Sequence, residues 1–281
     1  MISPQPGLTP DLFRTINAMI YEWTGVRYDD KKLYLLENRI RRRLRDLGLP
    51  GFEEYVRLLK SASGGERDVF IDLVTIHETF FFRNAPQLNV FVSTALRETV
   101  GRLSARGERS MRIWSAACST GEEPYTLAMM IEMERALPPG MDFTILATDI
   151  SAEAVKTARR GLYGPYSIRN TPPEYIRGCF NRVDEKNQEV KESVKKRVRV
   201  EQMNLLDSAG GPAAESMDIV FCRNVLIYFD TEVRRRVVGA LARSLKPGGF
   251  LFIGHAESLH GVSDEFAIEM VSGVPVYRKK G

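Results

Sequence analysis

The chain has 281 residues, of which 43% are hydrophobic and 27% are charged, and its net charge at pH 7 is only +4. This composition excludes a disordered chain and indicates a folded protein with one large or two modest domains. No run of about 18 apolar residues occurs, and the start "MISPQPGLTPDLF" lacks a basic region followed by an apolar run. We therefore expect a cytoplasmic protein that is not inserted in a membrane. The three cysteines and three histidines have no ligand spacing, so no metal site is expected.

The first predicted elements, from about residue 9 onward, are helices. In "KKLYLLENRIRRRLRDLG" (31–48) apolar residues recur every three or four positions, which makes one stripe of an amphipathic helix, and Gly48 is expected to end it. The other faces of this helix are strongly basic, so they form either a docking surface or an ordinary solvated face. The basic residues are Lys31, Lys32, Arg39, Arg41, Arg42, Arg43 and Arg45.

The next segment, "RDVFIDLVTIHETFFFRN" (67–84), again has an apolar pattern typical of a helix. We expect this helix to end near the aromatic cluster Phe80, Phe81 and Phe82. Residues 1–84 are thus predicted to be an all-helical domain, and residues 85–110 a linker helix.

From residue 111 to 281 the pattern changes to strands that alternate with helices. Strands rich in Val, Ile, Leu and Phe between helices predict a mostly parallel sheet covered on both faces, a doubly wound α/β domain. Residues 163–200 are too long and too polar for a plain crossover, so a small inserted subdomain is expected there. The predicted strands are "MRIWSAA" (111–117), "DFTILATDI" (142–150), "RVRVEQMN" (197–204), "MDIVFCRN" (217–224), "GGFLFIGHA" (248–256) and, as a further candidate, "PVYRK" (275–279).

The residues that follow the predicted strands indicate the ligand, because an open parallel sheet binds its ligands at the carboxyl ends of its strands. The first strand leads into "SAACSTGEEP" (115–124), whose small residues, Ala117 among them, permit close approach to the backbone. Neither GxGxxG nor GxxxxGK[ST] is present. Glu122 and Glu123 would repel a phosphate and favour a cation. Asp149, at the end of the second strand, suits a pair of ribose hydroxyls. S-adenosylmethionine (SAM), which is cationic and has no phosphate, fits these features.

Simpler interpretations exist for several of these residues. Glutamates in the first turn of a helix are stabilised by the helix dipole without any ligand. Without further evidence, His77 and His255 are interpreted as core residues or as residues that support a binding site without touching the ligand.

The chain resembles the chemotaxis-receptor protein-glutamate O-methyltransferase family, CheR, over nearly its whole length. The motifs that carry the resemblance are "TIHETFFFRN", "IWSAACSTGEEPYTLAM", "ATDIS", "MNLLD", "DIVFCRNVLIYFD" and "LKPGGFLFIGHAESL". The resemblance implies an all-helical N-terminal domain, a linker helix and a class I SAM-dependent methyltransferase domain, which is Rossmann-like, with an inserted β-subdomain.

The resemblance also assigns roles to residues of this chain. Thr79 and Arg83 would reach over the methionine part of SAM, with Arg83 as the partner of its carboxylate. Glu123, with Glu122 as a weaker candidate, would face the amino end, and Asp149 would hold the ribose. Asn204 and Leu205 would meet the adenine edge, and Asn224 and Val225 would line the pocket below the sulfonium. His77 and Ala117 are further predicted cofactor contacts.

The implied reaction transfers a methyl group from SAM to glutamate side chains of chemoreceptors and leaves S-adenosylhomocysteine. A glutamate is already ionised at pH 7, so the missing general base is expected. Tyr228 is the candidate for orienting the acceptor carboxylate, although it is equally consistent with a packing aromatic. Tyr228 and Arg83 are the predicted catalytic residues.

The predicted partner is the cytoplasmic signalling domain of methyl-accepting chemotaxis receptors, whose acidic faces would dock on the basic helix through Arg39, Arg42 and Arg43. The resemblance implies that family members which bind a C-terminal receptor pentapeptide do so through the inserted β-subdomain and a glycine-containing turn in it. Here the corresponding stretch, "RVDEKNQEVKESV" (182–194), is shorter and has no glycine, so we expect no binding of that peptide. Two alternatives remain at this point. A nucleic-acid methyltransferase is disfavoured because "CRNVLIYF" stands where [DN]PP[YF] is common, so no nucleic-acid partner is expected. A non-catalytic scaffold is disfavoured by the polar residues at the strand ends.

Overall fold

The structure is a computed structural model that describes residues 7–29, 33–61, 65–207 and 210–281. By their contacts the residues form two units. The first contains residues 1–76 and 228–233, and the second contains residues 77–227 and 234–281. The change of unit after residue 76 comes earlier in the chain than the predicted boundary at residue 84, and the segment 228–233 returns to the first unit.

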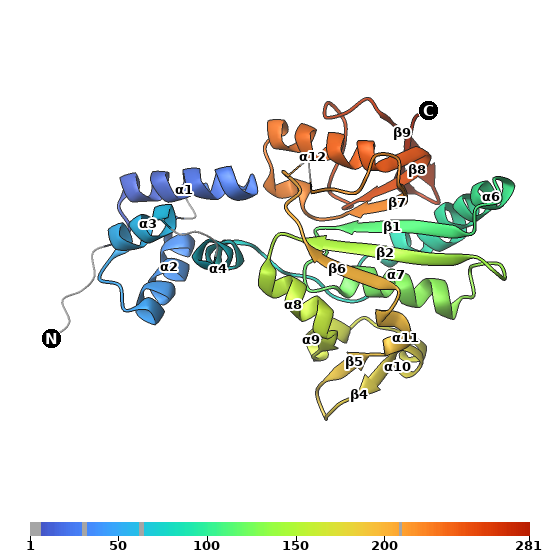
Figure 1. Cartoon of the computed structure of the whole chain (residues 1–281), viewed down its shortest axis with the longest axis horizontal. Helices are drawn as coiled ribbons and strands as arrows, with labels where there is room; N and C mark the ends of the chain where they lie inside the picture. Colours follow the sequence, from blue (N-terminus) through green and yellow to red (C-terminus); the bar gives the residue numbers. More distant parts are fainter. Residues whose placement is uncertain (1–6, 30–32, 62–64, 208–209) are drawn as a thin grey trace. The chain divides into compact units, whose positions relative to one another are not determined.

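Among the described residues of its N-terminal part, the first unit has four helices that share one apolar core. Figure 1 labels these helices α1 to α4. The side chain of Thr9 caps the first helix by accepting a hydrogen bond from the amide of Leu12, and Gly25, at φ 73°, ends it. On the second helix Leu36, Ile40 and Leu44 are fully buried, as their spacing predicts. The helices are α1 (Pro10–Thr24), α2 (Leu33–Leu47), α3 (Phe52–Ser61) and α4 (Gly65–Val74).

The predicted helix over 67–84 is wrong beyond Val74, where α4 ends. Residues 75–84 are not helical, and Phe82 and Asn84 have left-handed φ angles of 58° and 64°. The reason is tertiary packing, because the aromatic residues of this segment belong to the second unit. The ring of Phe81 is buried edge-on against the rings of Tyr163 (4.8 Å) and Phe180 (5.1 Å).

The stretch predicted as a linker helix runs from residue 85 to 105 and packs into the core of the second unit. Its central turn is a π-helix, and the ring of Phe91 in that turn lies 5.3 Å from the ring of Phe221 and 6.3 Å from that of Phe252. By its contacts this stretch therefore lies inside the second unit and contributes to its core. Its parts are α5 (Ala85–Val90), η2 (Phe91–Leu96) and α6 (Arg97–Ala105).

The second unit is built on a seven-stranded sheet in the order β6-β2-β1-β7-β8-β10-β9 (Figure 1). The first five strands are parallel, and β10 is antiparallel to both of its neighbours. The strand order reverses at β1, so the crevice for a ligand is expected at the carboxyl ends beside β1. The strand β9 was not predicted. The strands are β1 (Ser110–Ala116), β2 (Asp142–Asp149), β6 (Val198–Gln202), β7 (Met217–Cys222), β8 (Leu245–Ile253), β9 (Phe266–Val271) and β10 (Val274–Lys279).

The predicted inserted subdomain contains a separate antiparallel sheet in the order β3-β5-β4. Together with the helical first unit and the mostly parallel main sheet, it confirms the predicted fold class. Its strands and helices are β3 (Leu162–Tyr163), α9 (Pro165–Ile168), α10 (Pro173–Cys179), β4 (Phe180–Arg182), β5 (Gln188–Val190) and α11 (Glu192–Lys195); the other helices are α7 (Glu122–Met133), α8 (Ala152–Arg160), η3 (Leu226–Tyr228) and α12 (Thr231–Ser244).

Candidate active site

The loop after β1 has a backbone that alternates in handedness. Ala117, Ser119 and Gly121 all have positive φ angles, of 58°, 51° and 96°. A Cβ atom on Gly121 would lie 2.8 Å from the Cβ of Ala158 and 2.9 Å from the hydroxyl of Tyr163, so only glycine fits there. Gly121 thus permits close packing of the loop against Ala158 on α8 and Tyr163 on β3. The loop then leads directly into the N-terminus of α7.

Asp149 ends β2 and is 6% exposed. Its two carboxylate oxygens accept hydrogen bonds from the backbone amides of Ser119 (2.7 Å) and Ser151 (3.0 Å). The hydroxyl of Ser119 is buried and has no hydrogen-bond partner within the described part of the chain. A carboxylate has about four acceptor positions, so a group of this kind beside a buried hydroxyl suits a ligand that carries several hydroxyl groups.

The end of β6 lies next to the end of β2, because the amide of Met203 donates to the carbonyl oxygen of Asp149 at 2.8 Å. The predicted adenine contacts Asn204 and Leu205 follow immediately, and both line a cavity of about 250 Å³. The ring of Trp114 and the side chain of Arg243 also line this cavity. The structure therefore places the predicted ribose and adenine residues at neighbouring strand ends, but Asp149 is not among the residues that line this cavity.

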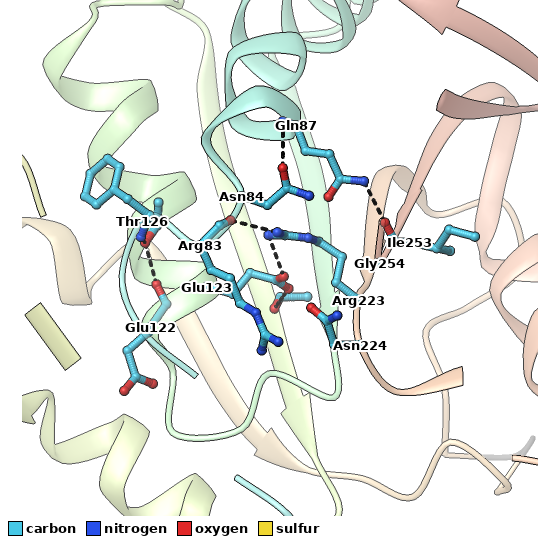
Figure 2. Close-up of polar contacts among 12 residues, drawn as sticks. Arg83, Asn84, Gln87, Glu122, Glu123, Thr126, Arg223, Asn224, Ile253 and Gly254 are labelled. Atoms are coloured by element: carbon cyan, nitrogen blue, oxygen red, sulfur yellow. Dashed lines mark hydrogen bonds and ion pairs between the residues drawn. The ribbon is translucent and has the colours of Figure 1, made fainter. Parts of the chain in front are cut away.

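Glu123 lies in the first turn of α7 and accepts two hydrogen bonds. Ser115 Oγ donates to Oε1 at 2.7 Å, and Arg223 Nη1 donates to Oε2 at 3.3 Å. Burial raises the pKa of Glu123, while the positive charge of Arg223 and the hydrogen bond from Ser115 oppose the rise. Figure 2 shows Glu123, Arg83 and Asn224 converging from three separate segments.

Glu122 has a different environment from Glu123, although the two are adjacent in sequence. Its side chain points away from Glu123 and Arg223 (Figure 2), and Thr120 Oγ1 donates to it at 2.6 Å. Burial raises the pKa of Glu122, and hydrogen bonds from Thr120 and Ser167 oppose the rise. Glu122 therefore supports the loop and the inserted subdomain, and only Glu123 joins the other predicted site residues.

The segment 77–84 contributes Arg83 to this group. The guanidinium of Arg83 donates to the carbonyl oxygen of Glu78 at 2.9 Å, and its own carbonyl oxygen accepts a hydrogen bond from Arg223 Nη2 at 2.7 Å. His77 and Thr79 are half-buried in the same segment. The segment is fixed to the rest of the unit by the amide of Phe82, which donates to Thr126 Oγ1 on α7 at 3.2 Å.

The end of β7 is held by a carboxylate that sequence reasoning did not single out. Glu257 accepts hydrogen bonds from the backbone amides of Asn224 (3.0 Å), Gly254 (2.5 Å) and Ile227 (3.1 Å). Asn224 has a left-handed φ of 60°, and the half-buried Val225 follows it. Glu257 thereby sets the shape of the turn that presents Asn224. The motif "GHAESL" contains it, but a lone glutamate after a strand gives no signal of such a role.

Tyr228 and the predicted docking arginines belong to the first unit by their contacts. Tyr228 is half-buried there. Burial raises the pKa of Tyr28, and the charge of Arg39 opposes the rise. Arg39 donates to the hydroxyl of Tyr28 (3.2 Å) and to the carbonyl oxygen of Leu73 (3.0 Å). These contacts tie α2 to the end of α4.

The other two docking candidates differ in exposure. Arg43 forms an ion pair with Glu66 at 2.5 Å, and Glu66 also accepts a hydrogen bond from Tyr55 at 2.8 Å. Arg42 is exposed. Of the three predicted arginines, Arg39 and Arg43 therefore have internal partners and Arg42 faces solvent; Lys31 and Lys32 lie outside the described residues.

Two family models match the chain in succession. The model described as "CheR methyltransferase, all-alpha domain" matches residues 11–75, and that described as "CheR methyltransferase, SAM binding domain" matches residues 77–273. Together they span both units. The chain belongs to the CheR methyltransferase family. The family predicted from the motifs is thus confirmed.

Named relatives of this CheR chain agree with the family models. It is 34% identical over 274 residues to Chemotaxis protein methyltransferase 1 of Pseudomonas aeruginosa, covering 95% of this chain and 97% of that protein. It is 35% identical over 263 residues to the Chemotaxis protein methyltransferase of Escherichia coli, covering 91% and 87%. The relative from Borreliella burgdorferi is 33% identical over 256 residues, covering 90% of each chain.

The strand-end residues of this CheR domain fit SAM as the cofactor. A carboxylate and a buried hydroxyl, from Asp149 and Ser119, suit ribose hydroxyls. The carboxylate of Glu123 suits an ammonium group, and the guanidinium of Arg83 suits a carboxylate. Among the described residues no cluster of His, Cys, Asp and Glu has the geometry of a metal site, and no helix is both long and apolar enough to cross a bilayer.

Proposed function

We propose that this CheR-family enzyme transfers a methyl group from SAM to glutamate side chains of chemoreceptor signalling domains, giving glutamyl methyl esters and S-adenosylhomocysteine. The observation that carries the proposal is that Arg83 and Glu123, two ionic groups of matching chemistry, lie together around Arg223 at the carboxyl end of β7 (Figure 2). A third, Asp149, ends the strand β2 of the same SAM-binding domain. The names of the relatives, which are chemotaxis protein methyltransferases, supply the substrate class.

The residues of this chain would bind and orient rather than transfer protons. SAM, when bound, supplies the methyl group. Glu123 would hold its ammonium group, Arg83 its carboxylate and Asp149 its ribose, with His77, Thr79, Ala117, Asn204, Leu205, Asn224 and Val225 as further contacts. The acceptor glutamate is ionised at pH 7, so alignment in a dry site is the main requirement. Tyr228 would orient that carboxylate by a hydrogen bond from its hydroxyl.

The chemical nature of the product tests this function. Incubation with methyl-labelled SAM and a receptor signalling domain should label the receptor, and mild alkali should release the label as volatile methanol. Esters are cleaved under those conditions, whereas methylated amines and amides are not. Label that stays on the protein after alkali would contradict the proposed reaction. A receptor domain with alanine at its methylated glutamates should take up no label.

The receptor would dock through the basic helix α2, with Arg42 as its main exposed contact, because Arg39 and Arg43 have internal partners. Arg42→Glu should lower kcat/KM for receptor methylation by at least about threefold at low salt, with a smaller loss at high salt, since exposed charges are screened. The measurement is methylation rate against ionic strength.

The control is Arg57→Glu, which reverses another exposed arginine of the same helical unit. Both variants should bind SAM as the wild type does. If Arg57→Glu slows methylation as much as Arg42→Glu does, general charge rather than docking on α2 explains the effect.

We also propose that the enzyme acts in the cytoplasm.

A second proposal is that a C-terminal receptor pentapeptide is not bound. The connection between β4 and β5 is a short turn closed by its own side chains. Asp184 accepts hydrogen bonds from the backbone amides of Lys186 (2.7 Å) and Asn187 (2.8 Å). This supports a compact hairpin without the glycine-containing turn that the resemblance associates with tether binding.

A further inference from the structure

Arg223 is a buried arginine directly after β7 that no motif assigned to the site. Only 4% of its side chain is exposed. A buried guanidinium is unfavourable unless partners compensate its charge. Burial lowers the pKa of Arg223, and the charge of Glu123 opposes this shift. Its position is therefore explained by the groups that compensate its charge.

The two partners of Arg223 are both predicted cofactor residues. Nη1 donates to Glu123 Oε2 at 3.3 Å, and Nη2 donates to the carbonyl oxygen of Arg83 at 2.7 Å (Figure 2). Glu123 lies on α7 and Arg83 in the segment before α5, so one planar guanidinium connects three separate parts of the unit. A lysine could not reproduce this fork, because its ammonium group is a single point of charge.

The contact with Arg223 favours the ionised form of Glu123. Burial raises the pKa of Glu123, and the largest opposing influence is the positive charge of Arg223, followed by the hydrogen bond from Ser115. Arg83 also lowers it, and the thiols of Cys118 and Cys222 lie nearby. A carboxylate that binds an ammonium group must be ionised, so its neighbour contributes to binding without touching the ligand.

We propose that Arg223 is a positioning residue of the cofactor site, which holds the carboxylate of Glu123 and the main chain of Arg83 in place for the amino-acid end of SAM. The inference rests on the proposed function, since that function assigns Glu123 and Arg83 to this end of the cofactor. A positioning role predicts different effects of Arg223 on two classes of ligand, whereas a merely structural role predicts equal effects. Ligands with the amino-acid end depend on Arg223, and ligands without it do not.

The test compares two ligands by calorimetry. Arg223→Gln should weaken the binding of S-adenosylhomocysteine by about tenfold or more, the effect of losing one charge-assisted contact. It should leave the affinity for 5′-methylthioadenosine, which lacks the amino-acid end, unchanged. Equal losses for both ligands, or no loss for either, would overturn the proposal. If the wild type binds neither ligand, the proposed function fails instead.

A matched control and a double variant complete the experiment. Arg197 forms an ion pair with Glu132 at 2.9 Å, at the other end of the same helix α7. Arg197→Gln should therefore leave both affinities unchanged. Glu123→Gln combined with Arg223→Gln should lose less affinity for S-adenosylhomocysteine than the sum of the two single losses, because part of the effect of Arg223 is transmitted through Glu123 and the rest through Arg83. Fully additive losses would overturn the proposal.

A conservative variant covers the case in which Arg223→Gln does not fold. Arg223→Lys keeps the charge but not the fork, so it should give a smaller loss for S-adenosylhomocysteine and none for 5′-methylthioadenosine. Wild-type affinity for both ligands in Arg223→Lys, together with unchanged affinity in Glu123→Gln, would show that this corner of the site does not contact the amino-acid end.

Discussion

Asp149→Ala is expected to weaken the binding of SAM and of S-adenosylhomocysteine by at least about tenfold, and by about a hundredfold if both ribose hydroxyls donate to it. Each hydrogen bond to a charged group contributes about 1.5–3 kcal/mol. The carboxylate is buried and accepts hydrogen bonds from the backbone amides of Ser119 and Ser151. Its replacement therefore removes both the ligand contact and the support of the loop. Calorimetric titration with S-adenosylhomocysteine measures the loss.

Two controls separate the ribose contact from damage to the loop. Asp142→Ala removes a carboxylate from the other end of the same strand and should bind the ligand normally. The wild type should bind a 2′-deoxy analogue of S-adenosylhomocysteine more weakly than it binds S-adenosylhomocysteine itself. Asp149→Ala should bind the two ligands with equal affinity. A further full loss with the analogue in Asp149→Ala would assign the 2′-hydroxyl to another residue.

The positions at strand ends could be predicted from the sequence because periodicity locates strands and topology locates their ends. Asp149, Asn204 and Asn224 were placed correctly in this way, at the ends of β2, β6 and β7. Their roles as cofactor contacts stay predictions. The same local reasoning failed for Phe81 and Phe82, whose spacing favours a helix but whose rings pack in the inserted subdomain. Spacing reports a local preference, and tertiary burial overrides it.

Contacts between residues far apart in the chain could not be predicted at all. Arg223 and Glu123 are about a hundred positions apart, and no local pattern links them. On the basic face of α2, the sequence also does not distinguish paired arginines from exposed ones. Its arginines all look alike in sequence, yet Arg43 is paired with Glu66 and Arg42 faces solvent. Sequence identifies the face of a helix, whereas the partner of each side chain depends on the neighbouring helix.

Gly121→Ala is expected to destabilise the fold by about 2–5 kcal/mol and to abolish measurable SAM binding. An alanine at φ 96° is strained by about 1–2 kcal/mol. Its Cβ would also lie 2.8 Å from the Cβ of Ala158 and 2.9 Å from the hydroxyl of Tyr163, and such overpacking costs about 1–3 kcal/mol. Urea denaturation measures the free energy of unfolding of the variant against the wild type.

Gly140→Ala separates backbone strain from collision in this experiment. Gly140 has a similar φ of 79°, but nothing lies within 4 Å of the position that a Cβ would take. Gly140→Ala should therefore cost only the strain, about 1–2 kcal/mol, and should retain SAM binding. Equal destabilisation by the two substitutions would mean that the loop after β1 yields to the added methyl group. In that case the close packing of the loop against α8 and β3 would not be what fixes the residues that follow it, Glu123 included.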